Sequence, residues 1–191
     1  RDLVGFIELC RKKGLKLILK PDPFIDAETN AGGIPQWLFK KYPETIAANR
    51  KGKPYIHGDS GMPRISYLHP KYLELVERYF NELGKRTARY QWPDGPIVAV
   101  QVDNETPGDG FITMSNFFTY NFKTDYNDYY KDRLWPMWLQ ERYGTITALN
   151  GAYGESYSHF SHVPMPDEWT GPKNREEFQI YMDLDRFAEY Q

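Results

Sequence analysis

Apolar residues recur every three or four positions in two long stretches of the chain, a spacing that predicts amphipathic helices. The first stretch is residues 2–13, which Gly14 follows where a left-handed residue would end a helix, and the second is residues 70–90. Two short, mostly apolar runs lie at residues 15–20 and 96–102. Proline or glycine bounds each run, so we predict two buried strands.

The rest of the pattern predicts further helices and, with the strands, a fold class. Helices are expected at residues 35–42, at residues 126–142 with Thr124 or Asp125 as the N-cap, at residues 146–153, and from about Asn174 onward. Helices and strands therefore alternate along the chain. This alternation predicts an α/β fold with parallel strands and crossover helices.

Long connections rich in glycine, proline and aromatic residues follow both predicted strands, whereas tight turns precede them. In a TIM (β/α)8 barrel the loops after the strands build the active site, and the loops before them only close the chain. We therefore expect part of such a barrel. A doubly wound open sheet shows the same alternation and stays open as an alternative, although no glycine-rich phosphate motif follows either strand.

Composition narrows the classes of function. A net charge of −2 gives no reason to expect nucleic acid or an anionic membrane surface as a partner. No apolar run approaches the length of about 18 residues that predicts a membrane span. Cys10 is the only cysteine, which excludes an internal disulfide. Aromatic residues make up 16% of the chain, which suits a carbohydrate-binding protein and equally a well-filled core.

Individual histidines and aromatic residues are better explained by packing than by ligand binding. His159 and His162 have no third metal ligand near them in the sequence, so we expect no metal site there. The aromatic residues expected to pack are Trp37, Trp92, Trp135, Trp138, Trp169, Tyr126, Tyr129 and Tyr130.

The expected chemistry centres on Asn104 and Glu105, which come directly after the second apolar run. A carboxylate at the mouth of a parallel sheet, partly desolvated by aromatic neighbours, has a raised pKa and stays protonated near neutral pH. Such a group can protonate a departing glycosidic oxygen, and the amide beside it can hydrogen-bond a sugar hydroxyl. The alternative is that both side chains only cap the loop.

Two motifs resemble those of a known enzyme family. Residues 20–28 read Lys-Pro-Asp-Pro-Phe-Ile-Asp-Ala-Glu and residues 32–38 read Gly-Gly-Ile-Pro-Gln-Trp-Leu, which together resemble the third-strand motif of glycoside hydrolase family 35 β-galactosidases. Residues 95–105 resemble the fourth strand of that family, and residues 138–154 resemble the related family 42 β-galactosidases. The resemblance implies a retaining β-galactosidase on a TIM barrel, acting without a cofactor on a terminal β-galactoside or a related carbohydrate.

The same resemblance implies roles for six residues. Glu105 would be the general acid/base, and Asn104 would contact the sugar next to the scissile bond. The pocket for the terminal galactose would be lined by Phe24, Asp26, Ala27 and Glu28.

Departures from the family pattern surround that pocket. Phe24 replaces a tyrosine, Thr29 replaces an aromatic residue, and Asp26 occupies a position often filled by cysteine or asparagine. These changes leave other substrates open, among them β-mannosides, β-glucosides and β-arabinosides. A non-catalytic carbohydrate-binding barrel is a further alternative, and Glu105 counts against it.

The second carboxylate of the mechanism is expected outside this chain. Retaining hydrolysis needs a nucleophile about 5–5.5 Å from the acid/base. The family resemblance implies that this nucleophile ends the seventh strand, and eight β/α units need roughly 250 residues. We therefore expect residues 1–191 to be part of one catalytic barrel domain, with the third and fourth units, and to be inactive alone.

Overall fold

The computed structural model describes residues 2–21, 33–56, 61, 63–101, 124–166 and 171–190. Every predicted helix and strand in these ranges is present, with ends shifted by up to a few residues. The elements are α1 (Leu3–Lys12), β1 (Leu17–Leu19), α2 (Gln36–Lys41), η2 (Pro43–Thr45), α3 (Pro70–Thr87), η3 (Ala88–Tyr90), β2 (Ile97–Val100), η4 (Tyr130–Leu134), α5 (Trp135–Tyr143), α6 (Ile146–Tyr153), η5 (Phe160–His162) and α7 (Arg175–Tyr190).

The two strands are neighbours in one sheet and run parallel, as predicted. Leu17 lies opposite Ile97 and Leu19 lies opposite Val100. The Gln101 N–H donates to the Leu19 carbonyl at 2.8 Å, so the pairing continues to the carboxyl end of β2. The segments that follow β1 and β2 therefore leave from the same edge of the sheet.

A small core behind the strand pair fixes the amino-terminal part of the chain. Ile7 of α1, Tyr90 and Ile97 of β2 are almost fully buried against one another. The Tyr90 hydroxyl donates to a Glu8 carboxylate oxygen at 2.8 Å, which ties η3 to α1. A Cβ on Gly95 would lie 2.1 Å from the Tyr90 carbonyl carbon and oxygen, so only glycine fits the turn that leads into β2.

The connection between α2 and α3 folds into three extended segments, residues 45–49, 53–56 and 63–66, which we call the three-segment loop. Their backbones bond in a ring: the Ala47 N–H donates to Arg64 at 2.8 Å, the Arg64 N–H to Tyr55 at 2.9 Å, and the Tyr55 N–H to Ala47 at 2.7 Å. The segments pack on α2 and α3 through a core of Ile34, Leu38, Phe39, Ile65 and Tyr72. The loop is therefore held as one unit.

The carboxyl-terminal part is a helical module of α5, α6 and α7. Its core includes five side chains with no exposed surface: Trp135, Leu139, Leu149, Leu184 and Phe187. A turn of π-helix, η4, precedes α5. Pro136 explains the wider turn, because proline donates no hydrogen bond and its ring displaces the carbonyl four residues earlier.

Asp183 of α7 is a fully buried carboxylate at the centre of this module. The Arg142 Nε donates to it at 2.8 Å, the Gln179 Nε2 at 2.9 Å and the Tyr153 hydroxyl at 3.0 Å, and the Tyr143 hydroxyl also donates. Burial, followed by the hydrogen bond to Asp183, raises the pKa of Tyr143 to about 12. One acidic residue thus joins α5, α6 and α7.

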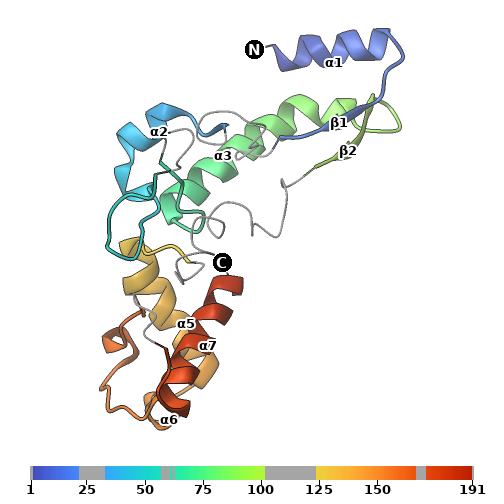
Figure 1. Ribbon diagram of the computed structural model, residues 1–191. Helices are drawn as coiled ribbons and strands as arrows, with labels where there is room; N and C mark the ends of the chain where they lie inside the picture. Colours follow the sequence, from blue (N-terminus) through green and yellow to red (C-terminus); the bar gives the residue numbers. More distant parts are fainter. Residues whose placement is uncertain are drawn as a thin grey trace.

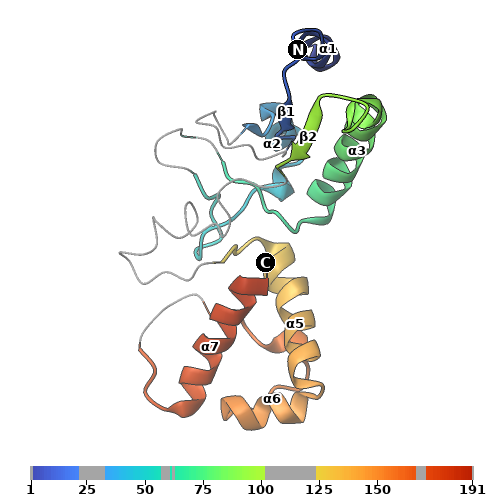
Figure 2. The ribbon, with the colours of Figure 1, turned by 90° about the vertical axis from the view of Figure 1, so that its right-hand side faces the viewer.

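The three parts are arranged along one direction. Figures 1 and 2 show α1 at one end of the molecule and the module of α5, α6 and α7 at the other. β1 and β2 run toward the helical module, and the three-segment loop lies between the two (Figures 1 and 2). The carboxyl ends of the strands therefore face the three-segment loop and the helical module. None of the helices in the described ranges is long and apolar enough to cross a bilayer.

Several packing predictions can be compared with this arrangement. Trp135 is fully buried and stacks on Trp138, and Tyr126 and Tyr130 are buried with Tyr129 packed beside them, as predicted. The prediction was wrong for Trp37 and Trp92, whose side chains are 53% and 58% exposed. Trp92 instead lies under the Lys16 ammonium group, 3.9 Å from the ring centre. Trp169 lies outside the described residues.

Candidate active site

The six predicted site residues, Phe24, Asp26, Ala27, Glu28, Asn104 and Glu105, lie outside the residues that the structure describes. The structure does describe the positions at which both site-bearing segments begin and end. The first follows β1 and ends at Gly33 and the buried Ile34. The second follows Gln101, which is bonded to β1, and ends at Thr124. The structure therefore defines the ends of both segments that carry the predicted site residues.

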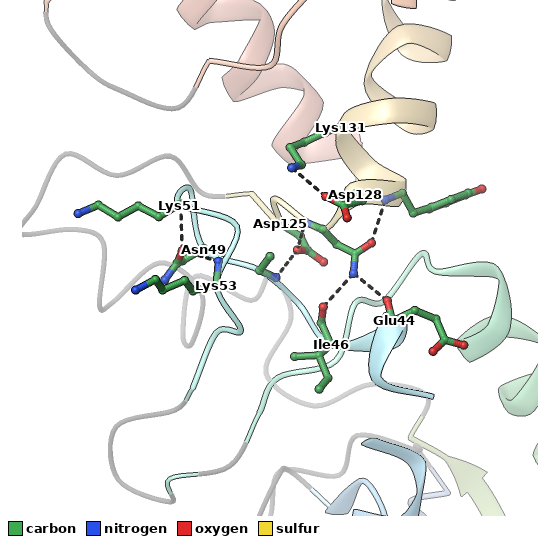
Figure 3. Close-up of polar contacts among 11 residues, drawn as sticks. Glu44, Ile46, Asn49, Lys51, Lys53, Asp125, Asp128 and Lys131 are labelled. Atoms are coloured by element: carbon green, nitrogen blue, oxygen red, sulfur yellow. Dashed lines mark hydrogen bonds and ion pairs between the residues drawn. The ribbon is translucent and has the colours of Figure 1, made fainter. Parts of the chain in front are cut away.

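Asp125 fixes the end of the second segment. Asp125 is only 5% exposed, and three groups among the described residues donate hydrogen bonds to its carboxylate. The donors are the Ala48 N–H at 2.8 Å, the Ser66 hydroxyl at 2.5 Å and the Asn127 N–H at 2.8 Å. Two of these donors belong to the three-segment loop: Ala48 lies 77 residues before Asp125 in the chain, and Ser66 lies 59 residues before it. Figure 3 shows the contact of Asp125 with this loop.

Asn127 extends the same attachment. Its amide nitrogen donates to the carbonyls of Glu44 and Ile46 at 2.8 and 2.9 Å (Figure 3). Its side-chain oxygen accepts from the Tyr129 N–H at 2.9 Å, so Asn127 caps the helix that leads into α5. The prediction of Thr124 or Asp125 as this cap was wrong, because the Asp125 carboxylate is taken up by the three-segment loop. We call these contacts of Asp125 and Asn127 the Asp125 clasp.

Burial dominates the electrostatics of the clasp. It raises the pKa of Asp125 to about 6, against the lowering effect of the hydrogen bonds from Ser66, Ala48 and Asn127. Burial and the nearby Asp125 charge also raise the pKa of Tyr130, which therefore stays protonated. The Tyr130 hydroxyl accepts from the Leu68 N–H at 2.9 Å, a further link between this helix and the segment before α3.

The Asp125→Asn substitution should make the stability of the Asp125 clasp less dependent on pH. Because the folded-state pKa of Asp125 is near 6 and its ordinary value is 3.8, the folded form holds the proton more tightly. Binding of this proton contributes its full free energy to folding below about pH 4. The contribution is lost as the pH rises through about 6, and the loss amounts to about 3 kcal/mol. Hydrogen exchange of the Ala48 amide, corrected for intrinsic rates, measures this. Equal slopes in the wild type and the variant would contradict the assignment.

Other features of the described residues do not form a second candidate site. A hollow of about 540 Å³ is lined by Gly5, Glu8, Leu9, Arg11 and Lys12, all on one side of α1, away from the carboxyl ends of the strands. The Nδ1 atoms of His159 and His162 bond to Ser161 and Ser158. Within the described ranges, no three acidic, histidine or cysteine side chains lie close enough to hold a metal ion.

The sequence prediction missed the role of Asp125, Ser66 and Asn127. Each is a small polar residue in a stretch without a recognisable motif, and their partners lie 59 to 83 residues away in the chain. Only the place of Asp125 just before a helical pattern was visible, and it indicated a cap. The long-range partner could not be inferred from one sequence.

Two named glycoside-active enzymes align with most of this chain. The exo-β-D-glucosaminidase of Pyrococcus horikoshii is 34% identical over 175 residues, which are 90% of this chain and 21% of that protein. The β-1,2-glucosyltransferase of Ignavibacterium album is 30% identical over 188 residues, 98% of this chain and 24% of that protein. The chain therefore spans between a fifth and a quarter of the length of these relatives.

Solved structures with a similar fold include β-galactosidases. The enzyme of the psychrophilic Marinomonas ef1 matches 97% of this chain and 26% of its own, with a TM-score of 0.64 and 20% identity. The enzyme of Bacillus circulans sp. alkalophilus matches 98% of this chain and 26% of its own, with a TM-score of 0.62 and 22% identity. These likenesses confirm the predicted fold, part of a TIM barrel with parallel strands, and remove the open-sheet alternative.

The family comparison covers the whole chain. Residues 1–191 match the model of glycoside hydrolase family 42, which is described as β-galactosidase. The parallel strand pair and the long segments that follow it agree with this match. The chain belongs to the family 42 β-galactosidases.

Proposed function

We propose that the full-length protein is a retaining β-glycosidase and that residues 1–191 form part of its catalytic barrel domain, as the third and fourth β/α units. The motifs after the strands also resemble those of family 35 β-galactosidases, to which we relate their roles. One observation carries the proposal: β1 and β2 are adjacent and parallel, with Leu19 opposite Val100. Glu28 follows Leu19 by nine positions, and Glu105 follows Val100 by five. The segments that carry the two glutamates therefore leave the sheet from the same edge.

The proposed reaction is a double displacement. Glu105 protonates the glycosidic oxygen as the bond to the anomeric carbon breaks, and a carboxylate from outside this chain attacks that carbon. In the second step the Glu105 carboxylate takes a proton from water, and the hydroxide releases the sugar. Asn104 hydrogen-bonds the sugar next to the scissile bond. These two carboxylates supply the acid, the base and the nucleophile, so the reaction calls for no cofactor.

The proposed pocket for the terminal sugar is lined by Phe24, Asp26, Ala27 and Glu28. The Glu28 carboxylate accepts hydrogen bonds from ring hydroxyls. Phe24 brings an aromatic face without a hydroxyl, which suits the apolar face of a sugar ring. We propose a terminal β-linked hexose as the substrate, with galactose first because of the family match.

A β-glucosaminide is the second candidate substrate. The Pyrococcus horikoshii relative, 34% identical, is named for this activity. Residues 22–28 also hold three carboxylates, Asp22, Asp26 and Glu28. A 2-amino sugar is cationic near neutral pH, and an excess of carboxylates favours a cation.

The test compares initial rates of the full-length protein on 4-nitrophenyl β-D-galactoside, β-D-glucosaminide and β-D-glucoside. We expect turnover of the galactoside or the glucosaminide, with the β-anomer of the sugar released first in the proton NMR spectrum. Release of the α-anomer would contradict a retaining mechanism. Binding of these sugars without turnover of any of them would favour a carbohydrate-binding barrel instead.

A further inference from the structure

We propose that His69 is an acid-sensitive cap, which holds the start of α3 against the helix leading into α5 only while its imidazole ring is neutral. This role goes beyond the function proposed above and does not depend on it, since every contact that carries it joins described residues. His69 stands where the three-segment loop ends and α3 begins. Its N–H donates to the Ser66 carbonyl at 3.1 Å, so it lies at the edge of the Asp125 clasp.

The imidazole of His69 caps the amino end of α3. Its Nδ1 atom accepts from the Lys71 N–H at 3.2 Å, and its carbonyl accepts from the Leu73 N–H at 3.0 Å. Because a backbone N–H can only donate, Nδ1 is the unprotonated nitrogen of the ring. Pro70 has no N–H, so the Lys71 N–H is the first backbone donor of the helix. Protonation of Nδ1 would set two donors against each other and place a positive charge at the positive end of the helix dipole.

The same ring contacts the helix that leads into α5. The His69 and Tyr129 rings meet edge-on, with their centres 5.6 Å apart and their planes at 62°. One position before the cap, the Leu68 N–H donates to the Tyr130 hydroxyl at 2.9 Å. The cap of α3 and the attachment of this helix therefore involve consecutive residues. A ring that turns away from Lys71 on protonation would also disturb the contacts with Tyr129 and Tyr130.

The surroundings of His69 set the direction of its response to pH. Burial lowers the pKa of His69 below its ordinary 6.5, and the Glu44 carboxylate of η2 acts in the opposite direction. Four further charged groups on the two neighbouring helices form ion pairs: Lys71 with Glu74 on α3, and Asp128 with Lys131 beside Tyr129. A lowered pKa means that the folded form resists the proton. The cap therefore contributes its full stabilisation above about pH 6.5 and loses it as the pH falls through the folded-state pKa of His69.

Asp125 responds to pH in the opposite direction. Its pKa is raised to about 6, so its contribution to the clasp grows as the pH falls. The Ala48 N–H, which donates to Asp125, should then gain protection from hydrogen exchange while the Lys71 N–H loses it. A loss of protection at Lys71 in acid therefore cannot be a by-product of the titration of Asp125.

The experiment measures hydrogen exchange of the Leu68 and Lys71 amides in the full-length protein, corrected for intrinsic rates, between about pH 7.5 and about pH 4.5. In the wild type we expect the protection of both amides to fall about fivefold toward acid pH, the effect of losing one helix cap. His69→Asn keeps a side-chain acceptor that does not titrate, so its protection should stay high throughout. His69→Ala removes the acceptor, and its protection should be low at every pH.

Two further variants test the cause of the effect. His159→Asn is the matched control, since the His159 Nδ1 also accepts from a backbone N–H, that of Ser161 at 3.2 Å, but caps η5 and is exposed. It should leave the pH dependence at Lys71 as in the wild type. Glu44→Gln removes the charge that favours the proton, so the loss of protection should move to lower pH.

Three outcomes would overturn the proposal. The first is protection at Lys71 that does not change with pH in the wild type, and the second is an equal fall in His69→Asn. The third is a fall at Lys71 without one at Leu68, which would confine the effect to α3. If His69→Ala does not fold, His69→Asn decides alone, because it keeps the cap. A protein that turns over no glycoside would contradict the proposed function and leave these outcomes unaffected.

Discussion

Replacement of Glu105 by glutamine in the full-length protein should lower kcat/KM on a glycoside with a poor leaving group by about 10²- to 10⁴-fold. Glutamine keeps the size of the side chain but cannot donate the proton that the departing oxygen needs. A good leaving group such as 2,4-dinitrophenolate needs no proton, so its glycoside should keep a much larger fraction of the rate in the first step. The measurement is kcat/KM for a series of aryl β-glycosides with leaving groups of different pKa.

The second step offers a further readout for the same variant. The Glu105 carboxylate activates water in that step, so the variant should accumulate the glycosyl-enzyme, and added azide should release it as a β-glycosyl azide. Glu141→Gln is the matched control, since Glu141 is an exposed glutamate on α5, and its rates should equal those of the wild type. An equal loss for good and poor leaving groups would assign Glu105 a role other than proton donor.

Replacement of Asp183 by alanine should destabilise the helical module by about 3 kcal/mol. The substitution removes the common acceptor of Arg142, Tyr143, Tyr153 and Gln179, and leaves two tyrosine hydroxyls buried without it. Arg142 is 30% exposed and can turn toward water, which limits the loss to the lower part of the usual range for buried ion pairs. The measurement is the free energy of opening from hydrogen exchange of amides in α5, α6 and α7.

Asp185→Ala provides the control for that experiment. Asp185 lies on α7 two residues further on and is exposed. Its removal deletes the same charge from the same helix without touching the core, so the free energy of opening should change by no more than about 0.5 kcal/mol. Equal effects of the two substitutions would mean that the network around Asp183 adds nothing to the stability of the module.

Elements that depend on local pattern were predictable from the sequence. The run that contains Leu17 and the run that contains Ile97 are apolar and bounded by proline or glycine, and both are strands. Residues 146–153 form a helix with the predicted ends because Thr145 caps it and Gly154, at φ +67°, ends it. In these cases the residues that determine the element lie within or beside it.

Features that depend on distant residues were not predictable. Phe6 belongs to the apolar stripe predicted for α1, yet its side chain is 56% exposed, while Ile7 beside it is fully buried against Tyr90 and Ile97. Hydrophobic spacing identifies a stripe but not which of its members meets a partner. The same applies to Asp125, whose contacts with Ala48 and Ser66 outweigh the local capping role.

For the candidate active site, sequence and structure contribute different parts. The identities of Glu105, Asn104 and Glu28 come from motifs that a family resemblance interprets, and these residues stay predictions. The parallel register of Leu19 and Val100 and the contacts of Asp125 come only from the fold, because both join positions roughly 60 to 80 apart in the chain. Neither part alone supports a glycosidase site at this edge of the sheet.

The register of the strand pair also has a consequence for synthesis of the protein. Leu17 leaves the ribosome 80 residues before its partner Ile97. At about 5–20 residues per second, the edge of β1 that pairs with β2 waits about 4–16 s for its partner. The helical module, whose core joins residues 126–187, makes most of its contacts within a short stretch of new chain. The β1–β2 pairing is therefore a contact that forms late relative to the synthesis of its first strand.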